Sequence, residues 1–97
     1  MIIVNLKKVG DFSKKHADAR KSLATWMKVT EESVWKKKQD VLVSFPHAKI
    51  IANNRARFEI VHNKYRLIAH VLYDDGIVVI RFIGTHNEYD KIDPSNV

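Results

Sequence analysis

Hydrophobic and polar residues follow two different periods in the two parts of the chain. After a short run at Met1–Leu6 that predicts a strand, hydrophobic residues recur at helical spacing from Val9 to Phe45. Pro46 ends this helical part, because proline lacks the N–H that a continuing helix needs. Beyond it the residues alternate, which predicts four strands, at Ala48–Ala52, Arg55–Val61, Tyr65–Tyr73 and Ile77–Ile83.

The helical part predicts helices that precede the sheet. Asp11 or Ser13 is placed to cap a first short helix, a second covers about Asp18–Val29, and a third follows over Ser33–Phe45. The 97 residues allow one domain, spanning residues 1–97. Helices followed by antiparallel strands indicate an α+β fold, in which N-terminal helices pack on one face of a C-terminal antiparallel β-sheet.

Two hairpin turns determine which side chains share a face of this sheet. A two-residue loop at Asp75-Gly76 places Arg66 opposite Thr85, and a turn at Asn63-Lys64 sets the preceding hairpin in the same way. One face is then apolar. A solvated polar face is the ordinary explanation for the other in an antiparallel sheet. That second face gathers Arg57, Glu59, Arg66, His70 and Arg81.

A short helix is expected directly after the last strand. Thr85 and Glu88 fit the T-x-x-E capping box, which places His86 and Tyr89 on roughly the same side of one turn, beside Arg66. An imidazole, a phenol and guanidinium groups can together cut RNA without a metal, by moving protons and stabilising the charged phosphorane. Packing in the cap region is the ordinary role of such a His-x-x-Tyr pair.

Composition favours an anionic partner and excludes several classes of chemistry. The chain has 17 Lys and Arg against 11 Asp and Glu, a net charge of +6, which attracts nucleic acid most of all. It has no cysteine, which excludes disulfides and thiol catalysis and favours a cytoplasmic protein. The spacing of its five histidines matches no metal-binding motif, and no apolar run is long enough to span a membrane. We therefore expect no metal or other cofactor and no membrane contact.

Three stretches carry a resemblance to a known family. They are N-K-Y-R-L-I-A from Asn63, R-F-I-G-T-H from Arg81 and E-Y-D-K-I-D from Glu88. The chain resembles the HigB family of bacterial toxins, within the RelE-like ribosome-dependent mRNA interferases. The resemblance implies a toxin that enters the ribosomal A site and cleaves translated mRNA as a metal-independent endoribonuclease. It also implies inhibition by a HigA-type antitoxin with a helix-turn-helix domain. The toxin would then be connected to operator DNA only indirectly, through this antitoxin.

The resemblance also implies roles for individual residues. RelE-like enzymes use an arginine of the Y-R-L strand, a basic residue after the last strand and a tyrosine near the C-terminus, which match Arg66, His86 and Tyr89. We expect Arg66 and Arg81 to bind the scissile phosphate, while His86 and Tyr89 share proton transfer. A non-catalytic RNA-binding or adaptor domain would need the arginines but neither His86 nor Tyr89. Further candidates for contacts with mRNA or ribosomal RNA are Arg55, Arg57, Lys64, Lys36 and Lys37.

Overall fold

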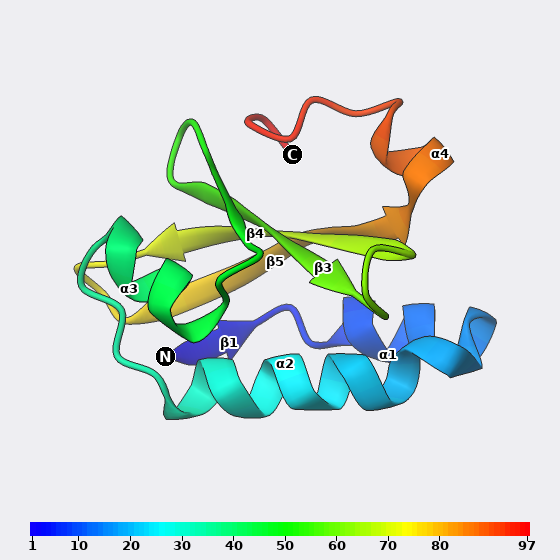
Figure 1. The fold of residues 1–97 in the computed structure, drawn as a ribbon, viewed down its shortest axis with the longest axis horizontal. Helices are drawn as coiled ribbons and strands as arrows, with labels where there is room; N and C mark the ends of the chain where they lie inside the picture. Colours follow the sequence, from blue (N-terminus) through cyan, green and yellow to red (C-terminus); the bar gives the residue numbers. More distant parts are fainter.

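A computed structural model describes residues 1–97 as a single sheet with its two longest helices on one side. Figure 1 shows α1 and α2 running below the sheet, while the C-terminal segment with α4 lies above it. The helices are α1 (Lys7–Lys15), the 3-10 turn η1 (Ala17–Ala19), α2 (Arg20–Glu32), α3 (Lys38–Ser44) and α4 (His86–Tyr89). The strands are β1 (Ile2–Val4), β2 (Lys49–Ile51), β3 (Arg55–Ile60), β4 (Tyr65–Leu72) and β5 (Ile77–Thr85). The expected α+β class is confirmed.

The sheet is mixed, in contrast to the antiparallel sheet expected from the sequence. Its five strands have the order β1-β5-β4-β3-β2. The four strands β2 to β5 pair antiparallel, as alternating strands joined by short loops should. Strand β1 pairs parallel with β5, with Ile2 opposite Ile77. The prediction was wrong here because alternation along a strand does not reveal which distant strand becomes its neighbour.

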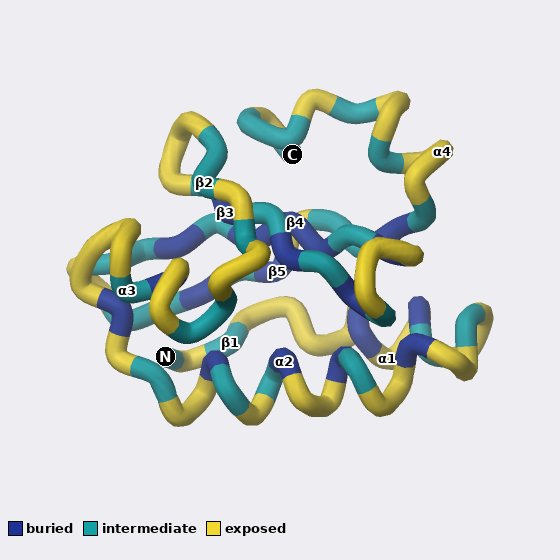
Figure 2. The backbone as a smooth tube through the Cα atoms, in the orientation of Figure 1, coloured by how far each residue is buried: buried dark blue, intermediate teal, exposed yellow.

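The core lies between the sheet and the helices. Leu23 and Trp26 of α2 are buried against it, and Figure 2 shows the buried positions of this helix on the side that faces the sheet. The aromatic rings of Trp26, Trp35 and Phe45 all pack near Phe58 of β3, with ring centroids 5.1 to 6.1 Å from that ring. These rings therefore stabilise the fold by burial and stacking and do not form an exposed surface for bases.

Two helix starts differ from the expected ones. Helix α1 begins at Lys7, so Asp11 and Ser13 lie inside it and cap nothing. Helix α3 begins only at Lys38, because Asp40 in its first turn accepts hydrogen bonds from the backbone N–H groups of Lys36 and Lys37. A carboxylate that caps from inside the first turn gives no N-cap signal before the helix. The third helix is therefore shorter than the expected Ser33–Phe45.

Both hairpin registers are shifted by two residues from the expected ones. Residues 61–64 and 73–76 form the loops, so Ile60 pairs with Tyr65 and Leu72 pairs with Ile77. In β3, in β4 and in β5 as far as Ile80, a shift of two keeps the side chains on their expected faces, because the side-chain period of a strand is two. Farther along, a β-bulge between β4 and β5 leaves Arg81 without a partner and places Arg66 opposite Gly84 in place of Thr85.

Candidate functional site

The face of the sheet opposite α1 and α2, called here the outer face, collects most of the candidate residues. In β3 the core residues Ala56, Phe58 and Ile60 alternate with half-buried polar ones, and β4 continues the alternation on its side of the pair. The grouping expected from the sequence is therefore present, although the pairs within it differ. On the outer face lie Arg55, Arg57, Glu59, Arg66, His70 and Arg81.

Tyr89 of α4 brings two of these arginines together. The guanidinium carbon of Arg66 lies 4.6 Å from the centroid of the Tyr89 ring, and that of Arg57 lies 5.9 Å from it. Both distances allow cation–π attraction. Helix α4 can present Tyr89 here because Thr85 and Glu88 form the expected capping box, with bonds of 3.3 and 3.0 Å between side chain and backbone. We call Arg57, Arg66 and Tyr89 the Tyr89 cluster.

Arg81 belongs to a different group on the same face, which we call the Arg81 cluster: Arg55, His70 and Arg81. Arg55 Nη2 and Arg81 Nε both donate to the main-chain oxygen of Val97, at 2.9 and 3.1 Å. Burial lowers the pKa of His70 below its usual value, and the charges of Arg55 and Arg81 lower it further. His70 is therefore uncharged at neutral pH. The alternation of the sequence predicts His70 on this face but indicates no role for it.

The C-terminal segment holds this second cluster in place. Asn53 Nδ2 donates to the main-chain oxygen of Ser95 at 3.0 Å, and Val97 accepts from both arginines of the cluster. Asp93 also accepts from the backbone and hydroxyl of Ser95. The last residues therefore fold back over the outer face, where Figure 1 shows the C-terminus.

His86 turns toward the loop between β3 and β4. Its Nε2 atom hydrogen-bonds the main-chain oxygen of Asn63. A carbonyl oxygen only accepts, so Nε2 carries the hydrogen, and in the neutral ring Nδ1 is left free to accept a proton. The capping box predicts His86 and Tyr89 on the same side of one turn, beside Arg66. Tyr89 contacts Arg66, whereas the contact of His86 is with Asn63, a residue to which no role had been assigned.

The outer face contains guanidinium nitrogens that lack partners. The Nε atoms of Arg55, Arg57 and Arg66 are buried and make no hydrogen bond. Buried donors in proteins are nearly always paired, and a planar guanidinium pairs best with a carboxylate or a phosphate. Glu59, the acidic residue opposite Arg66 in the sheet, forms no ion pair with it. These three arginines therefore have no carboxylate partner within the protein.

The candidate lysines have other positions. Lys64 forms the one ion pair of the structure, with Asp18 at 2.6 Å, and Tyr65 donates to the same carboxylate at 2.8 Å. These hydrogen bonds lower the pKa of Asp18 and join β4 to η1. Lys36 and Lys37 lie in the segment between α2 and α3, at the end of the molecule away from α4 (Figure 1). Neither group belongs to the two clusters.

Two further observations concern metals and membranes. No group of three or more histidine, aspartate and glutamate side chains is arranged to hold a metal ion. None of the helices combines the length and the apolar character that crossing a bilayer requires.

A comparison with protein families decides the family of this chain. The model of HigB toxins, described as the RelE-like toxic component of a toxin-antitoxin system, matches residues 19–92. The chain belongs to the HigB toxin family. The matched region of this HigB-family toxin contains both arginine clusters and α4, and its α+β fold is RelE-like. A comparison with curated protein sequences found no match. As the toxic component of a toxin-antitoxin system, the protein has an antitoxin as its partner.

Proposed function

We propose that this HigB-family toxin is an endoribonuclease that cleaves translated mRNA on the ribosome, with the Tyr89 cluster as the site of the scissile phosphate. The observation that carries the proposal is the pair of guanidinium groups of Arg57 and Arg66, which share one ring and keep unpaired Nε donors. Fixed donors aimed at developing charge are usually the largest single contribution to such a reaction.

The proposed reaction needs no group beyond the side chains and the RNA. The 2′-oxygen attacks the neighbouring phosphorus while its proton passes to a base, for which Nδ1 of His86 is the available atom. Arg57 and Arg66 stabilise the negative charge on the phosphorane, and Arg81 joins them once the RNA reaches its cluster. The Tyr89 hydroxyl donates a proton to the departing 5′-oxygen. The products are a 2′,3′-cyclic phosphate and a 5′-hydroxyl.

The partners follow from the same proposal. Arg55 and Lys64 contact the mRNA backbone, and Lys36 with Lys37 contacts ribosomal RNA at the other end of the molecule. Such contacts weaken steeply with salt, because binding releases counterions. A HigA-type antitoxin with a helix-turn-helix domain inhibits the toxin and connects it to operator DNA. The toxin acts in the cytoplasm, where translating ribosomes are found.

Expression without the antitoxin tests this proposal. We expect growth arrest and cuts within translated frames, detected by primer extension on a reporter mRNA, and no cuts when its start codon is removed. The matched variants are Arg66→Ala on the outer face and Arg20→Ala on exposed α2, which remove the same charge from opposite sides of the sheet. Arg20→Ala should cut like the wild type. Equal cutting of the untranslated reporter would contradict ribosome dependence.

One observation favours a second candidate, a non-catalytic RNA-binding or adaptor domain. His86 already has a hydrogen-bond partner in Asn63, as a residue that only fixes the loop would have. In that case the arginines bind RNA and the message stays intact. Growth arrest without any mRNA cuts would favour this candidate.

A further inference from the structure

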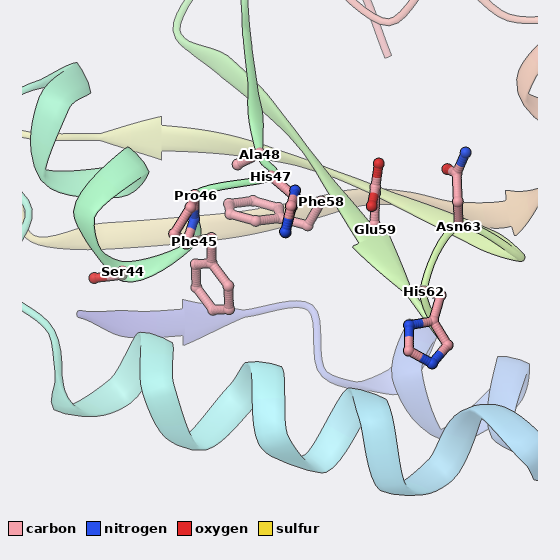
Figure 3. Close-up of a pocket in the computed structure, with 9 residues that line it drawn as sticks. All are labelled: Ser44, Phe45, Pro46, His47, Ala48, Phe58, Glu59, His62 and Asn63. Atoms are coloured by element: carbon pink, nitrogen blue, oxygen red, sulfur yellow. The ribbon is translucent and has the colours of Figure 1, made fainter.

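A cavity of about 400 Å³ lies at the edge of the sheet beside β3. Phe45 and Phe58 form its apolar part at one end, and the turn after β3 closes the other end (Figure 3). Its size is in the range of pockets that hold small planar ligands. The polar residues that line it are Ser44, His47, Glu59, His62 and Asn63.

The cavity is open because the sheet is incomplete along this edge. Strand β2 pairs with β3 only from Arg55 to Arg57, so β3 has no neighbour on that side from Phe58 onward. The chain leaves the sheet before β2, and the space beside Phe58 stays unfilled. Phe58 itself is 1% exposed, so the aromatic surface that a ligand can reach here is that of the half-buried Phe45.

The turn that closes the cavity is held in an unusual conformation. Val61 and His62 have φ angles of 53° and 57°, in the left-handed region that residues with a side chain rarely adopt. The N–H of Val61 donates to Ser22 Oγ at 2.9 Å, which anchors the turn to α2. Such strained residues cluster at functional sites when the surrounding structure fixes them.

Two residues connect the cavity to the candidate active site. Glu59 lines the cavity and lies opposite Arg66 in the β3–β4 register. Asn63 also lines the cavity, and its main-chain oxygen is the partner of His86. Figure 3 shows the side chains of Glu59 and Asn63 pointing to the same side of the sheet. Facing residues of paired strands have Cβ atoms about 4.5–5.5 Å apart, a distance that one nucleotide bridges between phosphate and base.

Glu59 gives the cavity a preference for one kind of ligand. Its half-buried carboxylate makes no hydrogen bond, and the one ion pair of the structure joins Lys64 and Asp18. A carboxylate only accepts hydrogen bonds. Among the RNA bases, guanine offers two adjacent N–H donors on one edge, whereas adenine and cytosine offer one amino group beside an acceptor. Uracil offers one N–H between two oxygens.

We propose that this cavity is a nucleobase subsite that selects guanine next to the scissile phosphate, an inference that rests on the proposed cleavage of RNA. The base lies against Phe45, and Glu59 accepts from its two N–H groups. The phosphate of the same nucleotide reaches Arg66 across the strand pair. Single-stranded RNA is commonly read in this way, by contact with the base faces and hydrogen bonds to their edges. The subsite would thus set which bonds in the message are cut.

Binding of mononucleotides to the purified full chain tests the subsite without any cleavage. In NMR titrations, 5′-GMP should shift the amide signals of Phe58, His62 and Asn63 in a saturable way, more strongly than 5′-UMP. Glu59→Gln should weaken 5′-GMP binding on the order of tenfold, since bonds to a charged acceptor are among the stronger ones. It should also favour 5′-AMP, because a glutamine amide matches the donor and acceptor of adenine. Glu32→Gln on exposed α2 is the control and should change neither.

Cleavage products give an independent result. On translated mRNA, wild-type cuts should fall next to guanine, and Glu59→Gln should move them toward adenine. If the wild type binds 5′-GMP but cuts no RNA, the proposed function fails and with it the role of the cavity in choosing cut positions, while binding of guanine by the cavity stands. If it cuts RNA while Glu59→Gln leaves both the cut positions and the nucleotide titrations unchanged, the subsite is overturned. Shifts of the cavity signals with the antitoxin but with no nucleotide would assign the groove to a protein partner and would also overturn it.

Discussion

Two groups of cationic side chains lie on the same face of one sheet but differ in what they contact. In the Tyr89 cluster, Arg57 and Arg66 lie over one aromatic ring, and their Nε atoms have no hydrogen-bond partner. In the Arg81 cluster, Arg55 and Arg81 both donate to Val97, and His70 stays uncharged between them. An unpaired Nε occurs in both clusters, since Arg55 has one too, but only the guanidinium groups of the Arg81 cluster donate to the C-terminal segment of the protein.

The difference shows that positive charge alone does not define a phosphate site. A guanidinium has five N–H donors, and which of them are free decides whether it can bind RNA in the folded protein. The bulge in β5 contributes to the separation of the two clusters. Arg81 is the extra residue of the bulge and has no partner in β4, whereas Arg66 is paired with Gly84. We therefore expect the chemistry to depend on the Tyr89 cluster first and on the Arg81 cluster less.

The largest effect is expected from Arg66→Ala. Loss of a fixed donor to the transition state should lower single-turnover cleavage on the order of 10²-fold or more, with ribosome binding retained. Ribosome co-sedimentation and cleavage should be measured on the same preparations, with Arg20→Ala as the charge-matched control. A loss of binding as large as the loss of cleavage would make the outer face a general electrostatic surface.

Tyr89→Phe tests the hydroxyl separately from the ring. The variant keeps the ring under both guanidinium groups, so the arginines stay placed. If the hydroxyl protonates the leaving oxygen, cleavage should still fall on the order of 10²-fold. Cleavage by Tyr89→Ala should fall further, because this variant loses the ring as well as the hydroxyl. Full activity of Tyr89→Phe would show that Tyr89 only positions the two arginines through its ring and takes no part in proton transfer.

Arg81→Ala should have a smaller effect on cleavage, about tenfold or less, because Arg81 is bonded to the C-terminal segment. It should also change His70. Burial and two neighbouring charges lower the pKa of His70, so removing one charge should raise that pKa toward its usual value. NMR titration of the His70 ring measures this directly. A loss of cleavage as large as that of Arg66→Ala would remove the distinction between the two clusters.

The smallest effect is expected from Asp18→Asn, which lies outside both clusters. Hydrogen bonds from Lys64 and Tyr65 lower the pKa of Asp18 in the folded protein, so its carboxylate stabilises the fold above the unfolded pKa near 3.8. This stabilisation is lost as the pH falls through the folded pKa. The variant should therefore melt at a lower temperature than the wild type at pH 7, and the difference should shrink as the pH falls through the lowered pKa of Asp18. Unchanged cleavage at neutral pH is expected.

The sequence was sufficient for the strands and for the faces of β3 and β4, but not for the pairs across them. Alternation placed Arg57, Arg66 and His70 on one face, and a shift of two residues in register left that result intact. The register itself depends on the conformation of the loops. In the loop after β3, Val61 and His62 adopt left-handed backbone angles, which their residue types do not predict.

The capping box and the bulge show the same contrast in the candidate site. Thr85 and Glu88 are three residues apart, so a local pattern was enough to place α4 and Tyr89. The position of Arg81 depends on a bulge, and its contact with Val97 joins residues that are distant in the chain. Neither follows from local residue preferences. The separation of Arg81 from Arg66 could therefore be found only in the structure.

The most direct test of the account is the chemistry of the ends that cleavage leaves. Purified wild-type toxin is added to ribosomes programmed with a defined mRNA, and the fragment ends are analysed by mass spectrometry after a single turnover. Attack by the 2′-oxygen at the Tyr89 cluster predicts a 2′,3′-cyclic phosphate on one fragment and a 5′-hydroxyl on the other, with neither present in the Arg66→Ala reaction. Intact mRNA, or fragments that carry a 5′-phosphate, would contradict the account.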